Sequence, residues 1–425
     1  MLQLKLPANG SLKTFGYSML PLLQDGDIVY FHKIPFSSIK TFDIILVNKN
    51  KKYFTHRVIY KTQKYLITKG DDNNYSDGRI LPSQIVGRVY QIKRNKDIFP
   101  VESLSLVQNA SYLQEIGQIT DLFQKNHIDF VFLKGLPIYL FYTKEMPKRI
   151  YADCDTLVAE KDFTRAKNIL LANGFHQQIN SSFLAKFLEP HLMEEDFIKT
   201  RGNYPIMIDL HKRPFSYIRK LDFPDSLYPK RRMDRFNSEL FRTKRWVEVS
   251  SIKIPIPDKD YLLLFLSLHF FTHTMKMMHR LWLIKEVVRK DKKTPGSWSS
   301  FVHLTSSYQM DFMVYPAFYF VNKLYNKIIP SLVLRQIKPT GNADEIYKLK
   351  TDLVFDERVD LSRVINKIYI SWAFSPQSFF KRLSLLVSPT LLLLLLTYIK
   401  PIRSLVVVDI KKLYRNKLRK MRIAV

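Results

Sequence analysis

The sequence predicts a multidomain chain in which an all-β module is followed by an α/β (α+β) domain and a helical C-terminal region. Short apolar or alternating runs cut by turn residues fill residues 1–95. Longer segments with helical spacing alternate with strand-like runs over 100–255, and helical spacing dominates 256–380. An apolar run and a basic tail, 381–425, end the chain. We therefore expect four units with these boundaries.

Five short runs define the expected β module. They are DIVYF (27–31), DIILV (43–47), HRVIY (56–60), KYLITKG (64–70) and IVGRVYQI (85–92). Alternation with a period of two indicates a strand with one buried face, whereas a wholly apolar run indicates burial on both faces. Turn signals separate the runs, and the spacing is typical of an all-β fold.

The pattern changes after Pro100. A segment with helical spacing, 102–126, precedes three strand-like runs, FVFLKG (130–135), DTLVA (155–159) and PIMIDLH (205–211). Strands alternating with helices favour a sheet covered by helices. Further along, Asp258 precedes a long apolar run and is predicted to cap the first helix of the helical region.

Charge and cysteine content limit the partners and the compartment. The formal net charge of +29 favours an anionic partner, such as nucleotide phosphates or anionic lipid. A nucleic-acid partner is disfavoured, because the sequence has no zinc-finger, basic-zipper or ribonucleoprotein motif. The single cysteine, Cys154, excludes an internal disulfide framework and fits a reducing compartment. The first residues lack a secretion-type apolar run, so we expect a cytoplasmic protein.

The C-terminal end offers two readings. Residues 383–399 are apolar, with six consecutive leucines, and the tail 411–422 holds 7 Lys or Arg in 12 residues. Seventeen residues are slightly short for a bilayer span. The first hypothesis is therefore that the C-terminal end contacts an anionic membrane surface. The alternative is a buried helix followed by a solvated basic helix.

Four sequence motifs in the expected β module contain a first group of candidate catalytic residues. They are GYSMLPLLQDGDIVYF (16–31), FDIILV (42–47), THRVI (55–59) and TKGDDNNYSDGRILPSQIVGRV (68–89). Together, in this order, they resemble type I signal peptidases of the Ser/His branch over residues 14–90. A serine hydroxyl needs a nearby base to become nucleophilic, and an aspartate can orient an imidazole for that task.

The resemblance implies a serine endopeptidase without a cofactor. Ser18 is its nucleophile, His56 its general base and Asp77 its acid, with Asp71 as a structural or accessory acid and Asp72 as the third choice. The family's usual N-terminal membrane helix is not seen, so a processing peptidase is expected rather than a secretory one. A self-cleaving LexA-type relative is the alternative, but His56 stands where that mechanism uses lysine.

A second constellation lies in the α/β domain. Asp153 and Asp155 are two residues apart in a predicted strand and therefore point to one face. Asp209, on a later strand, is placed to complete a three-carboxylate site. Hard oxygen ligands suit Mg²⁺ with nucleotide phosphates.

The order of LKG, D-x-D, A-x-x-x-L-x-x-x-G-F and I-D-L-H resembles an uncharacterised family of nucleotidyltransferases in the polymerase-β-like superfold, over 105–290. The resemblance implies Asp153, Asp155 and Asp209 as metal ligands and a nucleoside triphosphate as substrate. Lys134 and Gly135 would flank its phosphates. The usual D-I-D-L is here D-C-D-T, and the Gly-Ser pair of better-known members is missing.

Three histidines, His269, His273 and His279, fall on the first predicted helices of the helical region. The first two are four residues apart and share a face, a spacing that can bind Zn²⁺. A core or substrate-facing role is favoured, because no H-E-x-x-H accompanies them.

Both constellations in one chain suggest the maturation of a small peptide, with one site cleaving a leader and the other transferring a nucleotidyl group. The alternative is a protein that binds peptide or nucleotide without catalysis.

Overall fold

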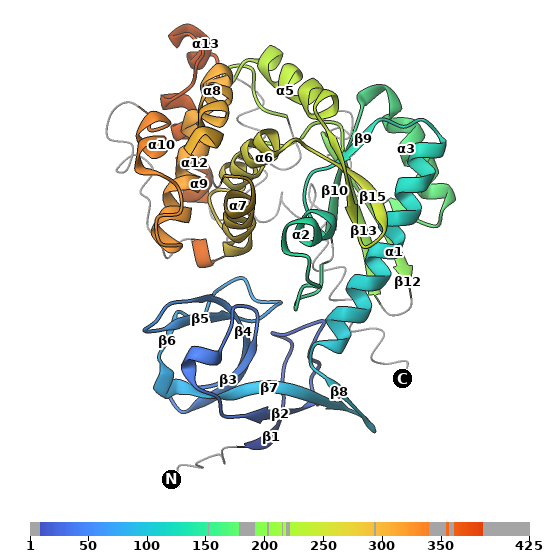
Figure 1. Cartoon of the computed structure of the whole chain (residues 1–425), viewed down its shortest axis with the longest axis vertical. Helices are drawn as coiled ribbons and strands as arrows, with labels where there is room; N and C mark the ends of the chain where they lie inside the picture. The colour runs from blue at the N-terminus through green and yellow to red at the C-terminus, as the bar shows by residue number, and fades with distance from the viewer. Residues whose placement is uncertain are drawn as a thin grey trace.

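The computed structural model describes residues 9–151, 153–177, 192–201, 204–214, 216–217, 222–292, 295–339, 354–356 and 361–385. Within them the chain forms an N-terminal sheet, a second sheet with flanking helices, and a C-terminal group of helices, which Figure 1 colours from blue to red. The predicted mixed α/β, multidomain class is confirmed at this level.

Residues 9–100 form an antiparallel sheet that we call the β module. Its strands are β1 (Asn9–Lys13), β2 (Ile28–His32), β3 (Ile44–Lys49), β4 (Lys52–Lys61), β5 (Leu66–Lys69), β6 (Arg79–Ile80), β7 (Ile85–Arg94) and β8 (Asp97–Pro100). They lie in the order β1-β2-β7-β3-β4-β5-β6, with β8 paired to β7. The five predicted runs correspond to β2, β3, β4, β5 and β7.

Strand β3 is buried on both faces, as its wholly apolar run predicts. Ile44 and Leu46 pack in one apolar cluster of the β module, and Ile45 and Val47 pack in another. Successive side chains of a strand point to opposite faces, so β3 contributes to both clusters. The β module therefore has two small cores, one on each side of this strand.

The second sheet and its helices, residues 103–256, are called the sheet domain here. Its elements are α1 (Ser103–Lys125), β9 (Phe130–Phe132), α2 (Leu136–Thr143), β10 (Asp153–Val158), α3 (Phe163–Ala172), β11 (His176–Gln177), β12 (Glu194–Arg201), β13 (Tyr204–His211), α5 (Lys230–Arg242), β14 (Arg245–Val249) and β15 (Ile252–Ile256). The main sheet has the order β11-β12-β13-β10-β9, in which β10 and β13 are parallel. Strands β14 and β15 form a separate hairpin.

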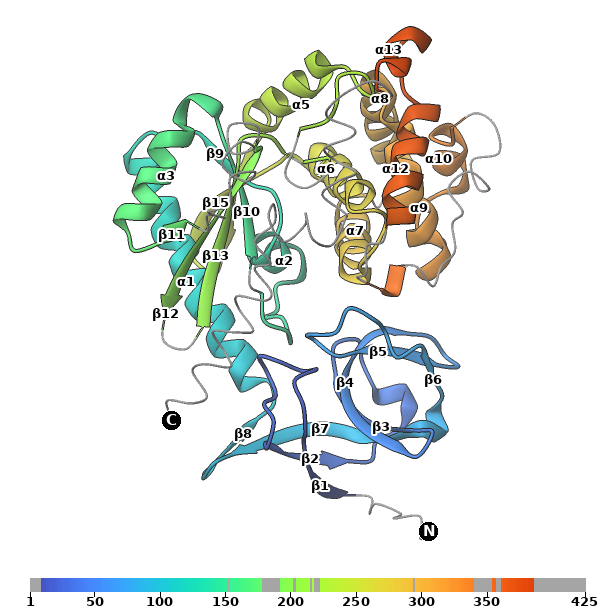
Figure 2. The same ribbon diagram turned by 180° about the vertical axis from the view of Figure 1, so that it is seen from behind.

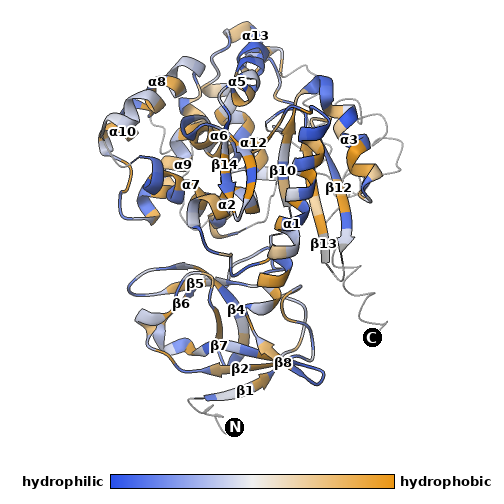
Figure 3. Cartoon of the chain, turned by 45° about the vertical axis from the view of Figure 1, so that its right-hand side comes forward, coloured by the Kyte–Doolittle hydropathy of each residue, from blue (hydrophilic) through white to orange (hydrophobic). Residues whose placement is uncertain are grey.

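Helices cover both faces of the main sheet. Figures 1 and 2 show α1 and α3 on one side and α2 on the other, together with α6 (Lys259–Thr272) and α7 (Met278–Asp291) of the helical region. On the α1 side, the Tyr112 hydroxyl donates to the Met207 carbonyl at 2.6 Å. Figure 3 shows that α5, at the surface, is largely hydrophilic.

The helical region follows the sheet domain. After α6 and α7 come α8 (Ser299–Tyr308), α9 (Asp311–Leu324), α10 (Ser331–Gln336), α12 (Leu361–Ala373) and α13 (Phe379–Leu383). Asp258 caps α6 as predicted, because its side chain accepts a hydrogen bond from the Asp260 amide at 3.1 Å. Helix α6 is buried on all sides, which fits its nearly unbroken apolar sequence.

The β module packs against the helical region. Tyr60 donates its hydroxyl proton to the Leu324 carbonyl at 3.0 Å, and the rings of Phe42 and Trp282 meet edge to face at 5.5 Å. The lower end of α7 lies directly above β4 and β5 in both views (Figures 1 and 2). Strand β4 is therefore held by contacts with the helical region as well as by pairing within its own sheet.

The predicted membrane contact falls beyond the described part of the chain. The basic tail 411–422 and most of 383–399 lie outside the described residues. Within the described ranges, no helix combines the length and apolar character needed to cross a bilayer.

Candidate functional site

Two of the carboxylates predicted to bind metal, those of Asp155 and Asp209, lie on adjacent strands of the main sheet. The parallel register of β10 and β13 places Asp155 directly beside Asp209, and the backbone of Asp153 pairs with Met207. On the other side of β13, Asp196 of β12 is the register partner of Asp209. Three adjacent strands therefore carry aspartates at one level of the sheet, and Asp196 was not foreseen from the sequence.

Asp155 is almost fully buried and lies between two basic side chains. Its Oδ2 is 2.6 Å from Lys134 Nζ, and its Oδ1 is 3.0 Å from His211 Nε2. Burial alone would raise the pKa of Asp155, but the Lys134 charge and the His211 hydrogen bond outweigh it and hold the pKa well below its usual range. Asp155 is therefore ionised at neutral pH. We call Lys134, Asp155, Asp209 and His211 the Asp155 site.

Lys134 reaches Asp155 because of the turn between β9 and α2. The amide of Leu133 donates to the Asp155 carbonyl at 2.9 Å, which brings the end of β9 alongside β10. Gly135 then turns the chain into α2 with a φ of 98°, in the region that favours glycine. The two residues predicted to flank phosphates thus stand at the start of α2, and Lys134 is paired directly with a predicted metal ligand.

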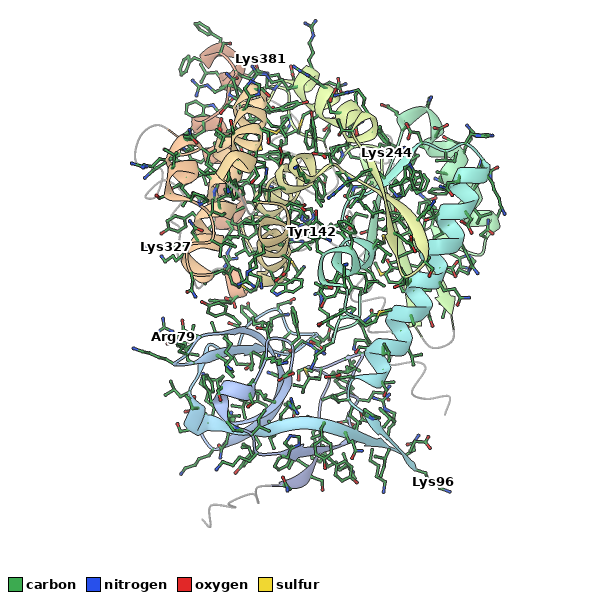
Figure 4. The ribbon with its side chains drawn as sticks, in the orientation of Figure 1. Arg79, Lys96, Tyr142, Lys244, Lys327 and Lys381 are labelled. Atoms are coloured by element: carbon green, nitrogen blue, oxygen red, sulfur yellow. The ribbon has the colours of Figure 1, made fainter. Side chains whose placement is uncertain are left out.

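The far end of α2 is anchored to α7. The Tyr142 hydroxyl donates to Asp291 Oδ2 at 2.6 Å and accepts from Arg245 Nη2 at 3.0 Å. Burial, followed by the charge of Asp291, raises the pKa of Tyr142, so its hydroxyl stays protonated. Figure 4 labels Tyr142 beside α2, where the sheet domain meets the helical region. This contact fixes the helix that carries Lys134 at its start.

Two of the predicted histidines face the Asp155 site from the helical region. The rings of His269 and His273, at the end of α6, lie 4.3 Å apart. Burial, followed by the interaction with the His273 ring and the positive charges of Lys134 and Arg280, lowers the pKa of His269 well below its usual value. The histidine pair is therefore neutral at pH 7, in a positively charged environment. Among the described residues, no three His, Cys, Asp or Glu side chains form a ready metal site.

The β module brings together three of the residues predicted for the serine site. Ser18 Oγ lies 2.9 Å from His56 Nε2, and His56 Nδ1 lies 2.7 Å from Asp77 Oδ2. The same Asp77 oxygen accepts the Thr68 hydroxyl at 2.7 Å. His56 is buried, with 6 % of its surface exposed, whereas Ser18 is half-buried. We call Ser18, His56 and Asp77 the Ser18 site.

The loop 70–73 supports the Ser18 backbone. The Asp72 amide donates to the Ser18 carbonyl at 2.8 Å. A Cβ atom at Gly70 would lie 2.6 Å from that carbonyl oxygen, so only glycine fits there. Asp72, the third choice for the acid, thus contributes its backbone to this contact.

Asp71 lies apart from the Ser18 and His56 pair. Its two carboxylate oxygens accept from Nε and Nη2 of Arg57, both at 2.7 Å. The buried Arg57 also donates to the Phe42 carbonyl at 3.0 Å and to the Lys148 carbonyl at 2.6 Å. Asp71 therefore holds an arginine that joins the β module to the sheet domain.

His211 and Arg57 are residues whose importance was missed from the sequence. His211 stands two positions after Asp209 in the I-D-L-H run, on the same face of β13, so its place in the motif is a usable signal. Arg57 directly follows His56 and points to the opposite side of β4. Nothing in the local pattern indicates its contact with Lys148, 91 positions away.

Comparisons with known proteins match one of the two families that the sequence resembles. The family model described as "Uncharacterised nucleotidyltransferase" matches residues 101–326, a longer range than the predicted 105–290. A solved structure of an antigenic nucleotidyltransferase-like protein from Paracoccidioides brasiliensis is similar at 11 % identity, with a TM-score of 0.30, covering 53 % of this chain and 96 % of that chain. No curated protein matches the chain. None of these comparisons supports a signal-peptidase module in residues 14–90.

Proposed function

Because the chain belongs to the family of uncharacterised nucleotidyltransferases, we propose that it transfers a nucleotidyl group from a nucleoside triphosphate to an acceptor. The observation that supports this best is the ionised, buried carboxylate of Asp155, which is in register with Asp209 and paired with the Lys134 ammonium. Carboxylates and cations facing each other suit a substrate that carries both phosphates and a divalent metal.

Asp155 and Asp209 are the residues that would hold Mg²⁺ in this proposal. Asp155 and Asp209 offer hard oxygen ligands on neighbouring strands, and Asp153 begins the same strand as Asp155. When bound, Mg²⁺ would offset the charge of the phosphates and orient the attacking and leaving oxygens. Lys134, whose Nζ lies 2.6 Å from Asp155, would contribute a positive charge toward the phosphates of a bound nucleotide. In the reaction the acceptor bonds to the α-phosphorus, and pyrophosphate leaves.

Nucleotide binding tests this proposal. A nucleoside triphosphate with Mg²⁺ is expected to raise the melting temperature of the wild type. At a free nucleotide concentration of 100 times Kd, the free energy of unfolding should rise by about 2.7 kcal/mol. Asp209→Asn should lose this gain because it removes an oxygen ligand. Asp121→Asn makes the same change on the exposed side of α1 and should keep the gain. Equal gains in melting temperature in all three proteins would show that Asp209 does not take part in nucleotide binding.

A second candidate function is serine peptidase activity, and the geometry of the Ser18 site favours it. His56 Nε2 would take the Ser18 proton as Oγ attacks a peptide carbonyl, and would then pass that proton to the leaving amine. Asp77 would orient the imidazole through Nδ1. The two activities together suit the maturation of a small peptide, and the rival is binding of peptide or nucleotide without catalysis.

Covalent labelling tests the second candidate. A fluorophosphonate probe, which reacts with activated serines, is expected to label the wild type but not Ser18→Ala. His56→Gln should slow labelling by roughly 10²–10⁴-fold, the usual contribution of a general base. Ser11→Ala, on the exposed strand β1, is the matched control and should react like the wild type. If the probe labels Ser18→Ala as strongly as the wild type, Ser18 is not the activated serine. The remaining candidate role is then binding without catalysis.

A further inference from the structure

The loop that follows β5, residues 70–78, contributes twice to the Ser18 site. Near its start, the Asp72 amide donates to the Ser18 carbonyl at 2.8 Å. Near its end, Asp77 Oδ2 lies 2.7 Å from His56 Nδ1. The loop contains no helix or strand that would fix its shape. The geometry of the Ser18 site therefore depends on the contacts that hold this loop.

The sheet domain holds the first part of the loop. Asp71 accepts two hydrogen bonds from Arg57, and the same guanidinium donates to the Lys148 carbonyl at 2.6 Å. Lys148 lies between α2 and β10. The part of the loop that supports the Ser18 backbone is thus connected to a residue outside the β module.

The helical region holds the second part of the loop. Asp356 Oδ1 accepts a hydrogen bond from the Ser76 amide at 3.1 Å and another from the Ser76 hydroxyl at 3.3 Å. Hydrogen bonds to a carboxylate are stronger than those to a neutral acceptor. Ser76 immediately precedes Asp77, so the acid of the Ser18 site adjoins a contact between residues that lie 280 positions apart in the sequence.

Asp356 follows two residues that pack into the structure. Val354 and Phe355 are buried, and the Phe355 ring lies 5.5 Å from the ring of Tyr60 on β4. In Figures 1 and 2 this short segment lies at the lower edge of the helical region, above β5. Packing of its neighbours therefore places the Asp356 carboxylate beside the loop.

The contact with Asp356 fixes the backbone just before Asp77. The Ser76 amide points to Asp356, whereas the Asp77 amide donates to the Thr68 carbonyl at 2.9 Å. These two amides flank the Cα atom of Ser76, so they fix both of its soft dihedral angles. Without Asp356, Asp77 would keep its contacts with Thr68, but the peptide that precedes it would be free to turn.

We propose that Asp356 is a positioning residue of the Ser18 site, which acts through Ser76 to hold Asp77 against His56. The inference rests on serine peptidase activity, the second candidate function. It adds that the site takes its active geometry from the helical region as well as from the β module. A small displacement of a group that takes part in catalysis lowers the rate even when the group itself is present.

The test compares Asp356→Ala with Asp356→Asn in the full chain. Asparagine keeps an oxygen that accepts from Ser76, whereas alanine does not. At a saturating concentration of the fluorophosphonate probe, Asp356→Ala should label Ser18 roughly 10–10²-fold more slowly than the wild type. Asp356→Asn should keep most of the rate. The probe concentration that gives half of the maximal rate should not change, because Asp356 acts on Asp77 and not on the probe.

Two further variants complete the set. Asp311→Ala is the matched control, because Asp311 also accepts a serine hydroxyl but does so within the helical region, at 3.2 Å from Ser306. It should label like the wild type. Ser76→Ala removes one of the two hydrogen bonds to Asp356 without a change in the helical region. It should slow labelling less than Asp356→Ala, and it keeps the test valid if that variant does not fold.

An NMR signal provides a second measurement, which needs no peptidase activity. The proton between His56 and Asp77 lies in a short hydrogen bond and should resonate far downfield in the wild type, but not in His56→Gln. Asp356→Ala should shift or broaden this signal, and Asp356→Asn should retain it. The melting temperature of each variant shows that it is folded, so loss of the signal cannot be ascribed to unfolding.

The two measurements separate this inference from the peptidase function. A rate and a signal that remain at their wild-type values in the folded variants would overturn the role of Asp356, and peptidase activity would stand. A wild-type chain that shows the signal but does not react with the probe would refute the peptidase function, and the signal in Asp356→Ala would then decide the positioning role. Absence of the signal from the wild type would remove the hydrogen bond that Asp356 is proposed to support.

Discussion

Asp155→Asn is expected to lower the rate of nucleotidyl transfer by at least about 10³-fold, equivalent to about 4 kcal/mol of transition-state stabilisation. Asp155 is the carboxylate at which Lys134 and His211 meet, and it is ionised at neutral pH. An amide keeps the shape of the side chain but loses the charge that a metal requires. The rate is measured as transfer from a triphosphate labelled at the α-phosphorus.

Folding and chemistry must be separated in that experiment. Removal of the Asp155 charge leaves Lys134 and His211 without their shared anion, so the melting temperature should also fall. The matched control, Asp121→Asn, should melt and react like the wild type. A folded Asp155→Asn protein with at least a tenth of the wild-type rate would contradict a role for Asp155 in catalysis.

Arg57→Met is expected to destabilise the chain by about 3–5 kcal/mol, the usual cost of breaking a buried ion pair by removing one partner. The Arg57 guanidinium donates to Asp71, to the Phe42 carbonyl and to the Lys148 carbonyl. Methionine fills part of the volume but donates no hydrogen bond. Denaturant unfolding followed by tryptophan fluorescence measures the loss.

Two further variants serve as comparisons for the loss of stability in Arg57→Met. Asp71→Asn should cost less than Arg57→Met, because Arg57 keeps its two carbonyl acceptors and Asp71 is partly exposed. Arg231→Met, at an exposed position of α5, should stay within about 0.5 kcal/mol of the wild type. If Arg57→Met is as stable as Arg231→Met, Arg57 does not join the two parts of the chain.

The strands of the β module were predictable because their patterns are local. Alternation and turn residues located β2, β3, β4, β5 and β7 to within a few positions. Strand β12 was not foreseen: its sequence, EEDFIKTR, is mostly polar. It forms because it pairs along its whole length with β13, a tertiary contact that overrides weak local propensity.

The candidate sites were predictable in their members but not in their partners. Family resemblance named Ser18, His56 and Asp77, and folding brings them within hydrogen-bond distance. It also gave Lys134 and Asp155 separate roles, whereas the turn after β9 pairs them at 2.6 Å. Such a pairing depends on how β9 meets β10, and no spacing in the sequence encodes it.

The position of a phosphate label most directly tests the claim that the Asp155 site transfers nucleotidyl groups. The wild-type chain is incubated with Mg²⁺ and a nucleoside triphosphate labelled at the α-phosphorus in one reaction and at the γ-phosphorus in another, with water or a supplied peptide as acceptor. Our account predicts that the α label moves to the acceptor and that the γ label leaves as pyrophosphate. A γ label on the acceptor, or its release as orthophosphate, would contradict it.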